Sequence, residues 1–318
     1  MDLDALQSAA ERVRTEIGRA VHGQDEVVDL LLIALFARGH CLLEGPPGTA
    51  KTLLARSLSA SLHLDFGRIQ FTPDLMPGDV LGVNIFDFAT SAFRLTKGPV
   101  FTDILLADEI NRAPPKTQAA LLQVMNERVA TIDGTDHALG PDFFVVATQN
   151  PIESQGTYPL PEAQLDRFLF KILIEFPDAA AEVEILSRHA VQSLDHAART
   201  DPLEPVLDRE TLAAGRGVVD GIRLDESLIR YIVALTRATR DDPEIRHGAS
   251  TRAADALAGA ARAAAALDGR DYAIPDDVQR LVGPAFNHRI VLGPTAEIEG
   301  RTPTQVLDNI LAQVEAPR

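Results

Sequence analysis

The sequence predicts an α/β fold in which a central parallel sheet is followed by an all-α domain. Short apolar runs alternate with segments of helical period between residues 40 and 174. One of these runs ends in a Gly/Pro-rich turn that opens directly into a helix. After about Pro177 the strand-like runs stop, and Ala, Arg and Glu dominate. We therefore expect two domains, at residues 1–176 and 177–318.

The first predicted domain begins with two helices. Apolar residues recur at helical spacing over residues 3–17, and a turn followed by a second helix is expected within residues 21–39. Further helices are expected over 53–64 and 115–126, and strands over 40–44, 67–71, 104–107, 143–148 and 168–174. Strands that are separated by helices favour parallel pairing, because a parallel pair needs a long crossover connection.

Two insertions interrupt this alternation. Residues 82–99 alternate apolar and polar side chains, which indicates a hairpin or a strand–helix excursion. Residues 128–139 carry Asp133-Gly134 between two β-prone runs. This dipeptide is the usual centre of a two-residue hairpin turn, so we expect a hairpin there.

The second predicted domain consists of helical segments. They are expected over residues 179–194, 226–240, 251–267 and 274–290. The Ala-rich stretch 253–266 predicts a helix whose small side chains allow close packing. No internal repeat or low-complexity linker is visible in the sequence.

The composition disfavours some classes of protein. The formal net charge is −16, whereas proteins that bind nucleic acid through its phosphates usually carry an excess of positive charge. No apolar stretch approaches the roughly 18 residues of a membrane span, and the N-terminus lacks the pattern of a secretory signal. The single cysteine, Cys41, rules out an internal disulfide and fits a reducing, cytoplasmic setting.

Residues 45–52 have the pattern of a phosphate-binding loop, between a predicted strand and a predicted helix. Backbone N–H groups and the helix N-terminus can surround a phosphate in that context. Lys51 is expected to reach the β- and γ-phosphates of ATP, and the Thr52 hydroxyl to ligate Mg²⁺. The strict pattern has glycine where this chain has Ala50, which we expect to adopt the helical conformation. The alternative is a plain turn before a helix. The loop residues are Gly45, Pro46, Pro47, Gly48, Thr49, Ala50, Lys51 and Thr52.

Polar residues follow two later predicted strands. Asp108 and Glu109 end the apolar run 104–107, which would place Asp108 near Mg²⁺ and let Glu109 polarise the attacking water. Asn150 follows the strand over 143–148. It could bond the attacking water or the γ-phosphate, or it could cap the turn before Pro151, and the residues alone leave both open.

Two arginines are candidates for phosphate contacts. Arg167 follows a Pro-rich loop, and Arg252 lies in the first turn of a helix that Ser250 would cap. The helix dipole disfavours a cation at that position, so an external anion is a reason for its presence. The alternative for any single arginine is a surface ion pair. The eight histidines show no metal-binding spacing.

Taken together, the motifs resemble those of the MoxR family of AAA+ ATPases. The similar segments include GHCLLEGPPGTAKT, LLADEINRAPPKTQAALLQVMNE, ATQNPIESQGTYPLPEAQLDRFL and HGASTRA, and they run in one order from about residue 21 to 252. The resemblance implies a P-loop AAA+ core with a helical lid. It also implies ATP hydrolysis, with ATP and Mg²⁺ as cofactors.

The resemblance assigns a role to each candidate. Residues 45–52 would be Walker A, where Ala50 is normal for the family, and Asp108 and Glu109 would be Walker B. Asn150 would be sensor 1. Arg167 would be the finger that acts on the ATP of a neighbouring subunit, and Arg252 would be sensor 2, reaching the γ-phosphate of its own chain. Further implied elements are adenine contacts at Val21, Gly23 and Gln24, a nucleotide contact at Leu53, a helix-2 insert over 82–99, a pre-sensor-1 hairpin over 128–139 and a weaker interface candidate at Arg112.

The implied assembly is a homo-oligomeric ring, usually a hexamer, because the finger arginine comes from a neighbour. Such a ring would remodel a client protein, often for metal or cofactor insertion, together with a von Willebrand factor A-domain protein on a separate chain. One alternative is an AAA+ nucleic-acid motor or loader, which the charge of −16 counts against. Another is a nucleotide-binding scaffold that does not hydrolyse ATP, which the complete residue set argues against.

Overall fold

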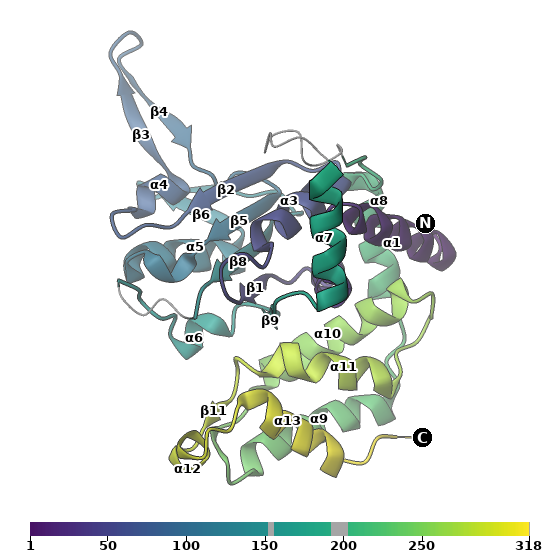
Figure 1. Ribbon diagram of the computed structural model, residues 1–318. Coiled ribbons are helices and arrows are strands. Elements are labelled where there is room, and N and C mark those ends of the chain that lie inside the picture. Colours follow the sequence, from purple (N-terminus) through teal and green to yellow (C-terminus); the bar gives the residue numbers. More distant parts are fainter. Residues whose placement is uncertain (152–155, 192–202, 318) are drawn as a thin grey trace.

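A five-stranded parallel sheet forms the centre of the computed structural model, which describes residues 1–151, 156–191 and 203–317 (Figure 1). Its strand order is β2-β5-β8-β1-β9. The bounds are Cys41–Glu44 for β1, Phe66–Gln70 for β2, Ile104–Asp108 for β5, Phe144–Gln149 for β8 and Phe170–Leu173 for β9. All pairings are parallel, as predicted. The sheet therefore has an amino edge, where every strand begins, and a carboxyl edge, where every strand ends.

Both faces of the sheet are covered, which explains why its strands are continuous apolar runs. Cys41 and Leu43 belong to one apolar cluster, and Leu42 between them belongs to another, because successive strand side chains point to opposite faces. The helices of the first half of the chain are α1 (Leu3–Gly18), α2 (Asp25–Phe36), α3 (Lys51–Ser61), α4 (Pro77–Leu81), the 3₁₀ turn η1 (Ile110–Arg112), α5 (Pro115–Glu127) and α6 (Glu162–Leu165).

Both insertions form antiparallel hairpins. Strands β3 (Gly82–Asp87) and β4 (Ala92–Lys97) make the first, which projects from the body of the protein (Figure 1). Strands β6 (Val129–Ile132) and β7 (Thr135–Ala138) make the second. Asp133 and Gly134 both have positive φ, at 48° and 79°, which is the backbone that the predicted two-residue turn requires.

The second half of the described chain is mainly helical, as predicted. Its helices are α7 (Ala179–Val191), α8 (Arg209–Asp220), α9 (Glu226–Asp241), α10 (Thr251–Leu267), α11 (Pro275–Phe286), α12 (Pro294–Ile298) and α13 (Pro303–Gln313). The last three residues of the helix expected over 179–194 lie outside the described residues. None of the helices in the described ranges is both long and apolar enough to cross a membrane.

Two features of this half are decided by packing. The alanines of α10 are the close-packing surface that its composition predicts, because Ala260 and Ala263–Ala266 are fully buried. A short antiparallel pair, β10 (Ile245–His247) and β11 (Val291–Leu292), joins segments that are more than forty residues apart. The composition does not predict this pair, because strands of two or three residues are too short to show a period.

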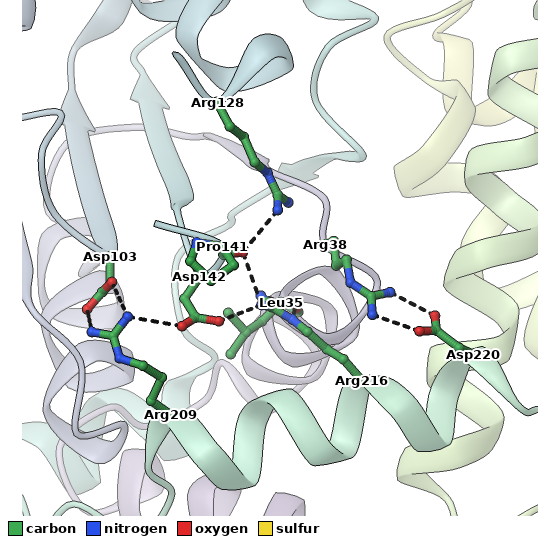
Figure 2. A network of polar contacts seen from close by, with 9 residues as sticks. All are labelled: Leu35, Arg38, Asp103, Arg128, Pro141, Asp142, Arg209, Arg216 and Asp220. Atoms are coloured by element: carbon green, nitrogen blue, oxygen red, sulfur yellow. Dashed lines mark hydrogen bonds and ion pairs between the residues drawn. The ribbon is translucent and has the colours of Figure 1, made fainter. Parts of the chain in front are cut away.

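Helix α8 docks on the first half of the chain. It packs against α1, α2 and α10, and a Cβ at Gly215 would lie 2.7 Å from a ring carbon of Phe36, so only glycine allows this approach. Arg216 of α8 donates to the Leu35 carbonyl oxygen and pairs with Asp142, next to the start of β8 (Figure 2). These contacts cross the boundary that the sequence predicts at residue 177.

His40 joins two elements at the amino edge of the sheet. It is buried, and its Nδ1 accepts a hydrogen bond from the Val145 N–H, so the proton of the neutral ring is on Nε2, which faces the Met125 carbonyl oxygen at 3.1 Å. Burial lowers the pKa of His40 to about 4, although the Met125 carbonyl opposes the shift. The ring is therefore neutral in the fold at pH 7.

We expect His40→Gln to reduce the loss of stability between pH 6.5 and pH 4. A histidine pKa that is lower in the fold than in the unfolded chain means that the unfolded chain binds more protons in this range, so stability falls as pH falls. The effect at His40 is up to about 3 kcal/mol, at about 1.4 kcal/mol per pKa unit. Urea unfolding at several pH values measures it. His63→Gln, at an exposed position, should leave the pH dependence unchanged, and equal slopes for all three proteins would contradict the prediction.

Candidate active site

The predicted phosphate loop joins the carboxyl end of β1 to the start of α3. A Cβ at Gly45 would lie 2.4 Å from the Ile174 carbonyl oxygen, so the loop can pass this point only with glycine. Lys51 Nζ donates to the carbonyl oxygens of Gly45 and Pro46, at 2.8 Å and 2.6 Å, and so lies across the loop. Burial lowers the pKa of Lys51, while the charges of Asp108 and Glu109 oppose the shift.

Ala50 does not have the conformation that we expected. Its φ of 60° and ψ of 19° are left-handed, and it precedes α3 as the N-cap residue. The glycine of the strict pattern is thus explained by the backbone, because a left-handed residue with a Cβ costs about 1–2 kcal/mol. The explanation that Ala50 continues the helix is wrong.

Asp108 lies at the end of β5, next to Thr52. Thr52 Oγ1 is 3.4 Å from Asp108 Oδ2. Asp108 is buried, and its two oxygens also accept hydrogen bonds from Thr148 Oγ1, at 2.7 Å, and from Arg68, at 2.7 Å. Strands β2, β5 and β8 therefore hold one carboxylate between them, and the sequence pattern did not single out Arg68 or Thr148.

Glu109 follows Asp108 in a left-handed conformation, with φ at 57°. Its backbone N–H donates to Thr148 Oγ1 at 2.9 Å. Its carboxylate accepts from Gln70 at 2.8 Å and from Arg112 at 3.0 Å. Arg112, which we considered for a subunit interface, thus contacts Glu109 of its own chain.

Asn150 and the segment 21–24 also lie at this edge. Asn150 directly follows β8, and its carbonyl oxygen accepts from the Asn111 side chain at 3.4 Å. Gln24 is buried and donates to the Glu175 carbonyl oxygen, while a Cβ at Gly23 would meet Ala181 at 2.8 Å. The segment therefore packs on the chain after β9, which Gly45 also touches. Leu53 lies in the first turn of α3, and Val21 is buried.

The residues at the carboxyl edge suit a nucleotide with a hard cation. A hydroxyl and a carboxylate oxygen lie side by side at Thr52 and Asp108, and such oxygens are the ligands that Mg²⁺ prefers. Within the described ranges, no cluster of three His, Cys, Asp or Glu side chains could hold a metal ion. A cation here would complete its shell with phosphate and water oxygens, as is usual for Mg²⁺.

Arg167 and Arg252 lie at the opposite, amino edge. Arg167 precedes β9, whose first residue pairs with Cys41 at the start of β1. Arg252 is 3.7 Å from Asp166, and its side chain is 69% exposed. Both arginines line one cavity of about 450 Å³. The expected position of Arg252 at the phosphate loop of its own chain is therefore not observed, because the lid packs at the other end of β1.

A cluster at the end of α11 holds this edge together. Arg289 is almost fully buried and donates to Asp166 Oδ1, at 2.7 Å, and to the Phe168 carbonyl oxygen, at 2.7 Å. His288 contacts the same carbonyl oxygen at 3.0 Å, and Asn287 donates to the carbonyl oxygen of Lys171. We name Asn287, His288 and Arg289 the lid clamp. The sequence pattern did not single them out, because their partners are more than 115 residues away.

Ala50→Gly should raise the free energy of unfolding by up to about 1.6 kcal/mol. Glycine removes the cost of the left-handed backbone, about 1–2 kcal/mol. Its greater conformational freedom in the unfolded chain lowers the stability by about 0.4–1 kcal/mol, which offsets part of the gain. Urea unfolding measures the change. Ala60→Gly, at an exposed position of α3, should lower the free energy instead, because α3 is right-handed there. A loss of stability in Ala50→Gly as large as in the control would contradict the strained backbone.

Comparison with known proteins places this arrangement in a family. Residues 40–170 match the model of the "ATPase family associated with various cellular activities (AAA)", and residues 237–310 match the AAA lid domain. The chain is 40% identical to "Chaperone MoxR1" of Mycobacterium tuberculosis, over 97% of this chain and 82% of that protein. It is 33% identical to "Protein MoxR" of Methylorubrum extorquens, over 92% of this chain and 90% of that protein.

A solved structure agrees with these matches. The crystal structure of a candidate ATPase from Cytophaga hutchinsonii superposes with a TM-score of 0.90 at 39% identity, over 99% of this chain and 97% of that chain. Fold, lid and sequence identity over nearly the whole length therefore agree. The chain belongs to the MoxR family of AAA+ ATPases.

Proposed function

We propose that this protein hydrolyses ATP at sites that two neighbouring copies of the chain share. One observation carries the proposal: the phosphate loop and Asp108 lie at the carboxyl edge of the sheet, whereas Arg167 and Arg252 lie at the amino edge. Strand β1 alone separates these edges by four residues, or about 13 Å. An arginine at the amino edge therefore acts on the nucleotide of another chain, in a closed ring that we propose to be a hexamer.

In the proposed reaction, each chain binds the nucleotide with its loop and completes its neighbour's site with its arginines. Backbone N–H groups of residues 45–52 and the Lys51 ammonium hold the β- and γ-phosphates. Thr52 and Asp108 would hold Mg²⁺, which neutralises phosphate charge when bound. Val21, Gly23, Gln24 and Leu53 are proposed to contact the rest of the nucleotide.

Glu109 is proposed to orient and polarise the attacking water. Its contacts with Gln70 and Arg112 hold the carboxylate beside the loop, and the hydrogen bond from its N–H to Thr148 sets the left-handed backbone. Asn150, at the end of the adjacent strand, is proposed to bond the water or the γ-phosphate. Developing charge on the γ-phosphate would be stabilised by Arg167 of the next chain.

Arg252 is proposed to act together with Arg167 on the neighbour's nucleotide. Its proximity to Asp166, and the cavity that both arginines line, support a shared target. This assignment replaces the expectation that Arg252 reaches the γ-phosphate of its own chain.

The work that ATP hydrolysis drives is proposed to be remodelling of a client protein in the cytoplasm. A related protein of this family is named a chaperone. The first hairpin carries an exposed aromatic cluster, in which Phe88 and Phe93 are 87% and 72% exposed and both pack on Phe86. Such a patch suits a protein partner. A von Willebrand factor A-domain protein on a separate chain is proposed as a further partner.

Mixing two inactive variants tests the shared site. Arg167→Ala keeps its own loop and Glu109, and Glu109→Gln keeps its Arg167, so each alone should bind ATP and lose about 10³-fold in rate. Phosphate release should recover in a mixture, because one mixed interface has a complete site. A mixture of Arg167→Ala with the double variant Glu109→Gln/Arg167→Ala should stay inactive. Arg252→Ala should also recover when mixed with Glu109→Gln, and it would not if Arg252 acts within its own chain.

Arg289→Lys should lower kcat about tenfold or more while the ATP dissociation constant stays unchanged. Arg289 holds Asp166, which adjoins Arg167 and contacts Arg252, but it lies at the edge opposite the phosphate loop. Lysine keeps the charge and loses the fork that spans several acceptors. Steady-state rates and fluorescent-ATP titration, both well below the unfolding temperature, separate the two effects. Arg280→Lys, on the preceding helix α11, is the control. An unchanged kcat would contradict a positioning role for the lid clamp.

A further inference from the structure

A second cavity at the amino edge lies beside the cavity that Arg167 and Arg252 line. Its volume is about 520 Å³, and four arginines contribute to its lining, namely Arg38, Arg128, Arg209 and Arg216. Arg38 and Arg128 also line the cavity that holds Arg167, so the two cavities adjoin. Two acids, Asp142 and Glu210, also belong to the lining, so four guanidinium groups share this cavity with two carboxylates. We name this second cavity the anion cavity.

Two of the arginines belong to a network of polar contacts with buried acids, which Figure 2 shows, and the Arg209 side chain itself is 49% exposed. Arg209 donates to both oxygens of Asp103, at 2.6 Å and 2.9 Å, and also contacts Asp142. Arg216 pairs with Asp142 at 2.7 Å and is 5% exposed. Asp142 is therefore shared between two cations, whereas Asp103 pairs, among the described residues, with Arg209 alone.

A third arginine has its own acid. Arg38 forms a bidentate pair with Asp220, in which both hydrogen bonds are 2.7 Å long (Figure 2). This pair is partly exposed, and Arg38 is part of the lining of the anion cavity.

Arg128 differs from the other three. Its side chain donates from Nη1 to the Pro141 carbonyl oxygen at 3.0 Å, and no carboxylate among the described residues pairs with it. Its Nε and Nη2 groups make no hydrogen bond in the described part of the chain. Arg128 is half-buried, and its backbone is left-handed, with φ at 51°, where α5 ends and β6 begins. The fold therefore holds a cation with free donors against the anion cavity.

Like charges and an acid both act on Arg128. Burial and then the charge of Arg38 lower the pKa of Arg128, although the charge of Asp142 opposes the shift. Burial, with the charges of Arg38 and Arg128, lowers the pKa of Arg216 to about 10, although Asp142 opposes the shift. An anion between these guanidinium groups would offset the repulsion between their positive charges. It would also accept hydrogen bonds from the free N–H groups of Arg128.

We propose that the anion cavity binds a small tetrahedral oxyanion of the phosphate type, with Arg128 as its main donor and with Arg38 and Arg216 supplying positive charge. The three arginines come from three elements and approach from different directions, as Figure 2 shows. A tetrahedral ion accepts hydrogen bonds from several directions, whereas a carboxylate accepts them mainly in one plane. The Arg128 carbonyl oxygen also accepts from the Leu139 N–H at 2.8 Å, so a bound ion would brace the base of the hairpin β6–β7.

Inorganic phosphate is the probe, and the chain is first saturated with ADP and Mg²⁺ so that the phosphate loop is filled. Calorimetric titration with phosphate is compared with sodium chloride at the same ionic strength. Wild type should bind phosphate, and thermal unfolding should shift upward with it. Arg128→Gln should weaken binding at least tenfold, and Arg128→Lys should give an intermediate affinity. Arg230→Gln, which removes an exposed arginine on α9, should bind like wild type.

Three outcomes would overturn the proposal. The first is equal phosphate affinity in wild type and Arg128→Gln. The second is a loss of binding in Arg167→Ala but not in Arg128→Gln, which would move the ion to the adjoining cavity. The third is an equal response to acetate, which would show a carboxylate site. If Arg128→Gln does not fold, Arg38→Gln is measured instead, with the same expected loss. Failure of ADP to bind would count against the proposed ATPase site and not against the anion cavity.

Discussion

All five strands of the sheet run in one direction, and this constraint separates the functional groups of the chain into two sets. The loop that follows β1, the acids that follow β5 and Asn150 after β8 meet at the carboxyl edge, because parallel strands all end there. Arg167 precedes β9 and therefore lies at the amino edge, where the lid brings Arg252 beside it. In the proposed mechanism, a chain built in this way holds two incomplete halves of one site. Joining them would require a second chain, which is why the proposed activity depends on assembly.

Each edge is stabilised by a buried charge with partners from several strands or helices. At the carboxyl edge, Asp108 accepts from residues of β2 and β8 and so fixes the relative position of three strands. At the amino edge, Arg289 bonds the Asp166–Leu169 segment and attaches α11 to it. Removing one partner of such a buried contact typically costs about 3–5 kcal/mol, since the other charge is left without compensation. These contacts therefore link the geometry of the site to the stability of the fold.

Two adjoining cavities at the amino edge are lined by arginines of an otherwise acidic chain. Arg38 and Arg128 line both the cavity of Arg167 and the anion cavity, so an ion in one changes the potential in the other. Arg128 also ends α5 and begins the hairpin β6–β7. One group of guanidinium side chains therefore connects the hairpin β6–β7 and helix α8 with the cavity that Arg167 and Arg252 line.

The sequence by itself determined the elements whose signals are local. The phosphate loop, the acids after β5, the Asp133-Gly134 turn and the alanines of α10 are all readable, because each depends on residues within a few positions of one another. Tertiary structure decided the rest. Packing between distant segments decides the left-handed Ala50, the bond from Arg68 to Asp108, the position of Arg252 at the amino edge, the lid clamp and the contact of Arg128 with the Pro141 carbonyl oxygen. Their partners depend on how helices and strands pack against one another. A local sequence pattern does not show this packing, because the contacting residues lie far apart along the chain.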